Sequence, residues 1–335
     1  MSEMQKYIDL FLTHCKQQRR LADHSIKGYS IDLRMFMEYL ESRTLPITGC
    51  SQVTKETLED YVGGISDKYQ VKTIKRKMAC IRSFFSYLEE YEAIAENPFH
   101  KFRLRLREGY KNPKSLTVSE MDRFLQAVYS DKFAVSAVKH LSRLRNMDKP
   151  VLKTLNGNFF WCRDSAIVEL LFAAGLRVSE LCGLRFEDYD RMERSLYIKG
   201  KGNRERTLYL ENAEVLAVLD NYLLMRKAVE TDHSYIFITR FRDPMSAQAV
   251  RNLITKYSNI AGINKRITPH VFRHSFASLL LESGVDIKYI QEFLGHSTIS
   301  TTQIYLHTSD KEKRKILAAK HPREQMRYNR WKKKD

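Results

Sequence analysis

Apolar residues recur at helical spacing through the first hundred positions of the chain. The spacing predicts four helices around a common core, the third of them near Lys55 to Val62. Asn97-Pro98 breaks the pattern, so we expect a helical domain over residues 1–99. The inward residues expected for the other three helices are Tyr7, Leu10, Phe11 and Cys15; Ile26, Tyr29, Leu33, Phe36 and Leu40; and Ile74, Met78, Ile81, Phe85 and Leu88.

A basic stretch at residues 100–115 separates this domain from the rest of the chain. It is rich in Lys and Arg and has no helical stripe, so we interpret it as a linker between two domains. Its alternating residues Phe102, Leu104 and Leu106 would also suit a short strand.

The second domain, expected over residues 116–320, opens with a capping box. Thr117 and Glu120 form the T-x-x-E pattern ahead of an apolar helix. Ser195 to Leu210 is expected to be a β-hairpin, since β-rich residues flank a glycine-bearing turn. Helices are expected on both sides of it. The predicted fold class is therefore mainly α with a small β-sheet, in a helical domain followed by a mixed α/β domain.

The stretch from Ile267 to Thr308 places polar residues with chemical uses in an orderly helical pattern. Thr268 and Pro269 predict the N-cap and first residue of a helix. Ser283-Gly284 predicts its end, because glycine is common just after a helix. The inward residues expected in this helix are Phe272, Phe276, Leu279 and Leu280.

Two further helices are expected in the same stretch. Asp286 is placed to cap the first and Gly295 to end it, which leaves His296 on the turn outside. The second carries Tyr305. The inward residues expected in the first are Ile287, Ile290 and Leu294.

These helices gather an unusual set of side chains. His270 and Arg273 are three residues apart and therefore neighbours on one helix face. Arginine can hold a phosphate by two parallel hydrogen bonds, and tyrosine is an oxygen nucleophile. Together with His296 and Tyr305, they suggest that a phenol attacks a phosphate diester.

The pattern H-x-x-R, then L-G-H, then a tyrosine nine residues after His296, resembles the C-terminal signature of the tyrosine recombinases, the phage integrase family. It is most similar to the Xer-like members. The resemblance implies a SAM-like core-binding domain and a catalytic domain that clamp DNA between them. It also implies that DNA strands are cut and rejoined through a 3′-phosphotyrosyl bond, without ATP, metal or any other cofactor.

The resemblance assigns roles to individual residues. Tyr305 is implied as the nucleophile, and Arg177 stands where the family has its first catalytic arginine. Glu180 is expected either to orient Arg177 or to form a plain structural ion pair with it. Lys201 is implied as the mobile lysine of the hairpin, with Lys199 as the competing choice. The full catalytic set is Arg177, Lys201, His270, Arg273, His296 and Tyr305.

A net charge of +17 and a pI near 9.5 favour a polyanionic partner. Charge alone would also suit an RNA-binding protein, whereas the signature above favours double-stranded DNA. A basic helix face is often only a solvated surface. The residues expected to contact DNA phosphates are Lys72, Lys75, Arg76, Arg82, Arg103, Arg105 and Arg251.

Other classes of site find little support in the sequence. The five cysteines are scattered without C-x-x-C spacing, which favours neither disulfides nor zinc. His270 and His274 have the spacing of a zinc helix, but Val271 stands where a metalloprotease has Glu, so no metal site is expected. The start of the chain does not resemble a signal peptide, and no apolar run is long enough to span a membrane. We expect a cytoplasmic, nucleoid-associated protein without a membrane partner.

Two segments depart from the compact Xer-like pattern. Residues 131–161 are interpreted as an insertion, with an added basic helix before Pro150 and a loop or hairpin at Asn156-Gly157. Residues 321–335 are interpreted as a basic C-terminal tail. By resemblance, the segment after Tyr305 docks on a neighbouring subunit, for which residues 316–319 provide an apolar patch.

The resemblance implies a homotetramer that acts on two DNA duplexes with inverted-repeat core sites. The two departures favour the integration or excision of a mobile element, with Xer-like resolution of chromosome or plasmid dimers as the alternative. A type IB topoisomerase shares the chemistry. From another class, the chain would be a non-catalytic DNA-binding accessory protein. A second recombinase in the tetramer and a directionality factor are left open.

Overall fold

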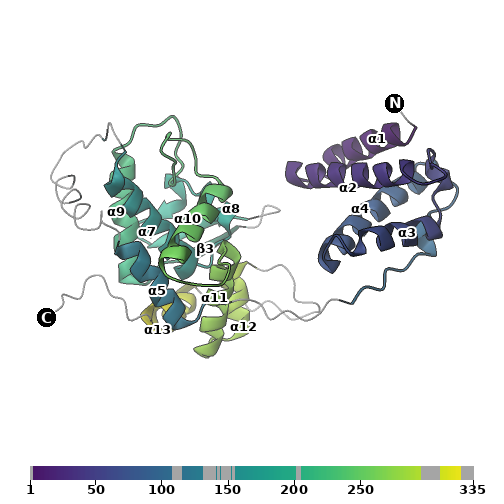
Figure 1. The fold of residues 1–335 in the computed structure, drawn as a ribbon. Coiled ribbons are helices and arrows are strands. Elements are labelled where there is room, and N and C mark those ends of the chain that lie inside the picture. Colours follow the sequence, from purple (N-terminus) through teal and green to yellow (C-terminus); the bar gives the residue numbers. More distant parts are fainter. Residues whose placement is uncertain are drawn as a thin grey trace. The chain divides into compact units, whose positions relative to one another are not determined.

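The computed structural model describes residues 3–107, 115–130, 155–200, 205–295 and 310–325, together with Leu141, Leu144 and Leu152 (Figure 1). The chain divides into two compact units, Met1–Lys111 and Asn112–Asp335. Both are mainly helical, and the second also contains a three-stranded antiparallel sheet, which confirms the predicted fold class. None of the helices within these ranges has the length and apolar character needed to cross a membrane.

Four helices enclose the core of the first unit (Figure 1), and the α2 helix packs against both α1 and α4. The inward residues predicted for the second and fourth helices lie in this core or pack against it. The set of inward residues predicted for the first helix is partly wrong. Leu10 is 47% exposed, because Ile8 and Phe11 take the inward positions. The helices are α1 (Glu3–Gln17), α2 (Asp23–Glu41), α3 (Lys55–Ser66) and α4 (Val71–Glu90).

The start of the basic stretch packs on this first unit. Phe102 is buried, and its ring lies 5.4 Å from that of Phe99 in an edge-on arrangement. Leu104 and Leu106 pack against the same core. From Lys101 to Arg107 the segment is neither helix nor strand. The alternation therefore comes from an extended segment with one side on the core, and not from a strand with a hydrogen-bonded partner.

The second unit is organised around α7 (Gly157–Ala173), which is buried on nearly every side. The helices α5, α8, α9, α10 and α11 all pack against it. The predicted capping box precedes α5: Thr117 Oγ1 accepts from the Glu120 amide, and Glu120 accepts from the Thr117 amide. The helices around α7 are α5 (Val118–Tyr129), α8 (Val178–Gly183), α9 (Ala213–Lys227), α10 (Ala247–Ile260) and α11 (Pro269–Glu282). The helix α12 (Ile287–Leu294) packs against α11.

The predicted hairpin is present as β2 (Ser195–Lys199) paired antiparallel with β3 (Glu205–Tyr209). A short strand that the sequence did not suggest, β1 (Tyr189–Asp190), adds to the outer edge of β2. After α9, Tyr235 and Ile238 form isolated bridges with Arg185 and Pro244.

The segment interpreted as an insertion is described only in part. Leu141 and Leu144 are buried in the core of the second unit, and the added basic helix otherwise lies outside the described residues. A loop or hairpin at Asn156-Gly157 is wrong. The Asn156 side chain accepts from the amides of Asn158 and Phe159, so this pair caps α7 instead of turning the chain back.

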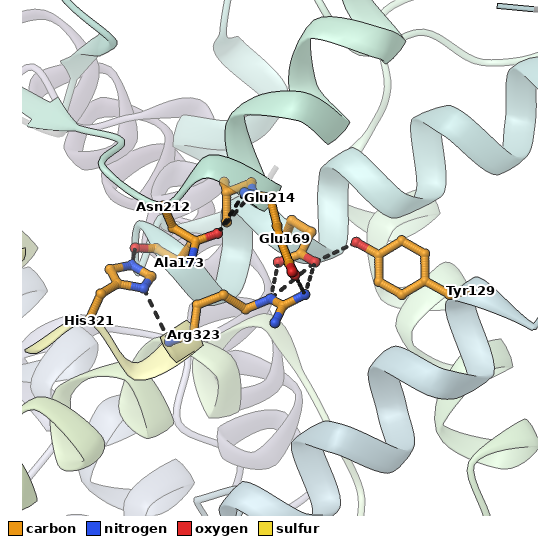
Figure 2. Close-up of polar contacts among 8 residues, drawn as sticks. Tyr129, Glu169, Ala173, Asn212, Glu214, His321 and Arg323 are labelled. Carbon is orange, nitrogen blue, oxygen red and sulfur yellow. Dashed lines mark hydrogen bonds and ion pairs between the residues drawn. The ribbon is translucent and has the colours of Figure 1, made fainter. Parts of the chain in front are cut away.

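The C-terminal segment packs on the second unit itself. In α13 (Asp310–Lys320), Leu317 is buried beside Phe276 and Leu280 of α11. A short 3-10 helix (Pro322–Gln325) follows. Figure 2 shows Arg323 between two carboxylates: it donates to Glu169 at 3.0 Å and to Glu214 at 2.7 Å. The start of the segment interpreted as a tail is therefore buried.

Candidate active site

The helix that carries the H-x-x-R motif folds as its sequence predicts. Thr268 is the N-cap of α11 and Pro269 its first residue, and Gly284 follows the helix with a left-handed φ of 73°. The four predicted inward residues are all buried. His270 lies exposed on the first turn, whereas Arg273, one turn further, is only 6% exposed.

Arg177 is placed by a tight turn between α7 and α8. Gly175 adopts a left-handed φ of 56°, and a Cβ at this position would lie 2.7 Å from Phe276 Cδ1 and 2.8 Å from Leu294 Cδ2. Glycine is needed there for both its conformation and its size. The turn leaves Arg177 as the N-cap of α8, with one third of its side chain exposed.

Glu180 connects two arginines from different elements. It accepts from the Arg177 amide at 2.9 Å and from Arg177 Nη1 at 2.7 Å. Arg206 of β3 approaches from the other side and donates to both carboxylate oxygens, at 3.0 and 2.8 Å. Burial raises the pKa of Glu180, but the bonds from Arg206 and Arg177 outweigh it and lower the pKa to about 2.

The carbonyl end of α12 is held by three arginines on successive residues. Arg206 Nε donates to Phe293 O at 3.1 Å, Arg273 Nη2 to Leu294 O, and Arg177 Nη2 to Gly295 O at 3.3 Å. The last carbonyls of a helix have no partner within the helix, and its dipole favours cations there. This helix end therefore brings together guanidinium groups from α11, β3 and the start of α8.

Gly295 ends α12 as predicted, with a left-handed φ of 61°, and Asp286 caps its start by accepting from the Lys288 amide. Ile290 and Leu294 are buried as expected, but Ile287 is 58% exposed, so that part of the prediction is wrong. On an isolated short helix, Ile287 fits the same stripe as Ile290. Among the described residues, no other element covers it.

Arg273 is buried, with 6% of its surface exposed. Its Nη1 donates to Gly175 O at 2.7 Å, and burial, together with the nearby Arg177, lowers its pKa to about 10. The side chain is still a cation at neutral pH. A guanidinium carries more N–H groups than these two carbonyls use, which leaves it able to donate to an anion as well.

Three of the predicted catalytic residues, Lys201, His296 and Tyr305, lie outside the described residues. The structure brings together Arg177, Glu180 and Arg273, next to the point where the chain enters His296. Lys199, the competing choice for the hairpin lysine, pairs with Asp188 at 3.3 Å.

The candidate DNA-binding residues lie on the surfaces of the two units. On α4, Lys72, Lys75 and Arg76 are exposed and lie within one turn, and Arg82 is exposed two turns further on. Arg76 also pairs with the buried carboxylate of Asp32. Arg103 and Arg105 are exposed between the apolar residues of the extended segment, and Arg251 is exposed on α10.

Within the part of the chain that the structure describes, no group of three or more His, Cys, Asp or Glu side chains could hold a metal ion. His274 is partly buried on α11.

Sequence reasoning missed Arg206. A signal was available: in a strand, alternate residues share a face, so Arg206 lies on the same side as the buried Leu208. A charged side chain on the inward face of a strand requires a partner. The partners lie on α8 and α12, which the strand itself does not reveal.

Two family profiles and several curated relatives match this chain along most of its length. The Phage integrase family profile matches residues 145–312, and the profile of the phage integrase N-terminal SAM-like domain matches residues 8–91. A tyrosine recombinase of Agathobacter rectalis is 38% identical, covering 98% of this chain and 100% of its own length. Tyrosine recombinase XerC of Thermodesulfovibrio yellowstonii is 33% identical, covering 96% of this chain and 98% of its own.

Among solved structures, a lambda integrase tetramer bound to a Holliday junction matches with a TM-score of 0.65 and 17% identity. The match covers 90% of this chain and 80% of the lambda integrase chain. At this level of identity the likeness concerns the fold.

Proposed function

Because the chain belongs to the phage integrase family, the tyrosine recombinases, which cut and rejoin DNA strands, we propose that it exchanges strands between two DNA duplexes at short inverted-repeat sites. The observation that carries this proposal is the meeting of Arg177 and Arg273 at the carbonyl end of α12. Arg177 keeps one third of its side chain exposed, and its acceptor Gly295 directly precedes His296 in the sequence.

In this proposal the two arginines bind the scissile phosphate. Arg177 and Arg273 donate to the non-bridging oxygens, where negative charge increases in the transition state. An oriented donor of this kind contributes about 3 to 4 kcal/mol. His296 adds a further donor to the same phosphate. The backbone carbonyls that already hold both arginines fix their positions before DNA arrives, so little reorganisation is needed during the reaction.

Tyr305 is proposed as the nucleophile. An unperturbed tyrosine has a pKa of about 10, so its proton must be accepted as the oxygen attacks phosphorus. His270, exposed on the first turn of α11, is the proposed base. The bond from phosphorus to the 5′ oxygen breaks, and Lys201 protonates that oxygen. The 3′-phosphotyrosyl bond conserves the diester's energy, so a 5′ hydroxyl of the partner strand can displace the tyrosine without ATP.

DNA binding is proposed to involve both units. Residues 1–99 form the core-binding domain, residues 100–115 the linker and residues 116–320 the catalytic domain. The basic residues of α4, with Arg103 and Arg105, contact phosphates on one side of the duplex, and Arg251 contacts them from the catalytic domain. The lambda integrase tetramer on a Holliday junction supports a homotetramer acting on two duplexes.

Two biological roles are proposed, each with its own support. Integration or excision of a mobile element is favoured by residues 131–161 and by the C-terminal extension, which depart from a compact recombinase. Resolution of chromosome or plasmid dimers is favoured by relatives named XerC that match along nearly the whole chain. The genomic position of the cleaved site separates the two roles.

The proposal is tested by expressing the protein beside its Tyr305→Phe variant in cells that carry its native DNA. The reaction is stopped with denaturant, and DNA that stays covalently attached is sequenced. Adducts at one inverted-repeat site, formed only with Tyr305, are expected. If both proteins bind duplex DNA and neither retains it covalently, the chain is an accessory DNA-binding protein. Strand exchange between two labelled duplexes distinguishes a recombinase from a topoisomerase.

A further inference from the structure

Arg206 occupies the centre of the arginine cluster without being one of the residues that the family signature suggests. Its side chain extends from β3, one strand of the hairpin that carries Lys201 in its turn. It forms a two-pronged ion pair with Glu180 and a third bond, from Nε, to Phe293 O. One side chain thus joins the hairpin, the start of α8 and the end of α12.

The surroundings of Arg206 do not suit direct contact with a phosphate. Its side chain is only 12% exposed, compared with 33% for Arg177. All three of its nitrogens already donate to protein oxygens. Its Cδ also lies close against Gly295, where a Cβ would come within 3.0 Å of it. Arg206 therefore acts on its neighbours and not on the substrate.

We propose that Arg206 is a positioning residue for strand cleavage, which sets the orientation of Arg177 through their shared partner Glu180 and fixes the hairpin against the end of α12. This inference rests on the function proposed above. Each oxygen of Glu180 accepts from both arginines, so the two-pronged pair with Arg206 sets how the carboxylate faces Arg177. Arg206 also packs against Gly295, whose carbonyl is the second acceptor of Arg177.

Removal of Arg206 is expected to misplace Arg177. The buried carboxylate of Glu180 would be left with Arg177 as its remaining arginine partner among the described contacts, and would draw that guanidinium away from the phosphate. A displacement of about 1 Å in a catalytic group costs up to about 100-fold in rate. The loss should appear in the cleavage step at saturating DNA, while affinity for the duplex changes little.

The experiment measures single-turnover formation of the Tyr305–DNA adduct on a nicked substrate that traps it. Arg206→Ala is expected to lower the rate about 10- to 100-fold, with duplex affinity within about twofold. Arg206→Lys keeps the charge and loses the two-pronged pair, so its rate of adduct formation should lie between those of Arg206→Ala and the wild type. Arg191→Ala is the matched control. It removes an arginine from the β1–β2 turn that pairs with Asp220, and the rate should not change.

Two further measurements separate positioning from general damage. Glu180→Gln is combined with Arg206→Ala, and the double variant should be no slower than the slower single variant, because both changes act on Arg177 through one contact. The second measurement uses DNA with a neutral methylphosphonate at the cleavage position. A neutral group develops less negative charge for the arginines to stabilise. On this DNA, Arg206→Ala should therefore lower the rate of adduct formation by less than about threefold. If Arg206→Ala does not fold, the same pair of substrates is used with Arg206→Lys.

The results that overturn the inference are distinct from those that overturn the proposed function. Adduct formation by the wild type and an equal rate for Arg206→Ala would overturn the inference alone. So would a defect of the same size on both substrates, or rate losses that multiply in the double variant. Failure of the wild type itself to form an adduct would instead overturn the proposed function.

Discussion

Two arginine–glutamate clusters in the catalytic unit have opposite compositions. At the end of α12, the three arginines Arg177, Arg206 and Arg273 lie around one carboxylate, Glu180. At the C-terminal segment, a single arginine lies between two carboxylates (Figure 2). The first cluster therefore has positive charge to spare, whereas the second has none. An excess of cations at a partly open surface suits a phosphate ligand.

The two clusters also differ in how they meet solvent. Arg177 keeps one third of its side chain exposed, but Arg323 is 2% and Glu169 1% exposed. Burial alone would lower the pKa of Arg323, but the Glu169 carboxylate raises it above its ordinary value. Tyr129 donates to the same carboxylate from α5. The comparison suits a C-terminal cluster that holds the fold together and a cluster at α12 that has the proposed role of binding the phosphate.

The largest expected effect comes from breaking the buried pair. Arg323→Met leaves Glu169 as a buried carboxylate without its cation, which should lower the free energy of unfolding by about 3 to 5 kcal/mol. Chemical denaturation measures this loss. Replacement of Glu169 by Gln in the same chain should restore part of the stability. A loss below about 1 kcal/mol for Arg323→Met would mean that the pair does not hold the fold.

The corresponding change in the other cluster should affect activity instead. Arg177→Ala is expected to lower the rate of adduct formation about 100- to 1000-fold, since it removes an oriented donor from the phosphate. Its unfolding free energy should change by about 1 kcal/mol or less, because the side chain is partly exposed. The two variants together test the contrast: if Arg177→Ala unfolds as easily as Arg323→Met, the clusters do not differ in role.

A smaller effect is expected from Gly175→Ala, which combines a left-handed φ with contacts to Phe276 and Leu294. The left-handed conformation alone costs about 1 to 2 kcal/mol, and the displaced side chains also move the carbonyls that hold Arg273. Both stability and cleavage should fall. Gly262→Ala is the matched control. It has a φ of 63°, and apart from its chain neighbours no described residue comes within 4 Å of the added carbon, so it should lose stability and retain activity.

A further effect concerns pH. The pKa of Glu180 is about 2 in the folded protein against an ordinary value of 4.5, so its carboxylate stabilises the fold above pH 4.5. That contribution is lost as the pH falls toward 2. The difference in unfolding free energy between the wild type and Glu180→Gln should therefore be largest above pH 4.5 and shrink below it. A difference that stays constant across this range would contradict the role of the charge.

Local rules in the sequence were sufficient to predict α11 and the hairpin. Thr268-Pro269 and Ser283-Gly284 fix the ends of α11 through backbone chemistry that neighbouring residues supply. The arginine cluster was only half predictable. Family resemblance suggested Arg177 and Arg273, but the meeting of their guanidinium groups at α12 depends on packing between distant segments.

Residues whose partners lie far along the chain were missed for the same reason. Arg323 looks like part of a basic tail until Glu169, more than 150 residues earlier, is brought beside it. Arg206 looks like an ordinary strand residue until α8 and α12 enclose it. The prediction for Ile287 fails in the opposite sense: its spacing predicts burial, but no neighbour within the described part of the chain covers it.

The carbonyls that hold the three arginines have a consequence for engineering. Every amino acid supplies the same carbonyl, so substitutions at Phe293 or Leu294 that keep the apolar packing leave these acceptors in place. A library that varies the surface of the catalytic unit to change DNA target preference can therefore alter side chains near α12 without removing an arginine's partner. The positions to keep fixed are the glycines, Gly175 and Gly295, whose backbone angles aim those carbonyls.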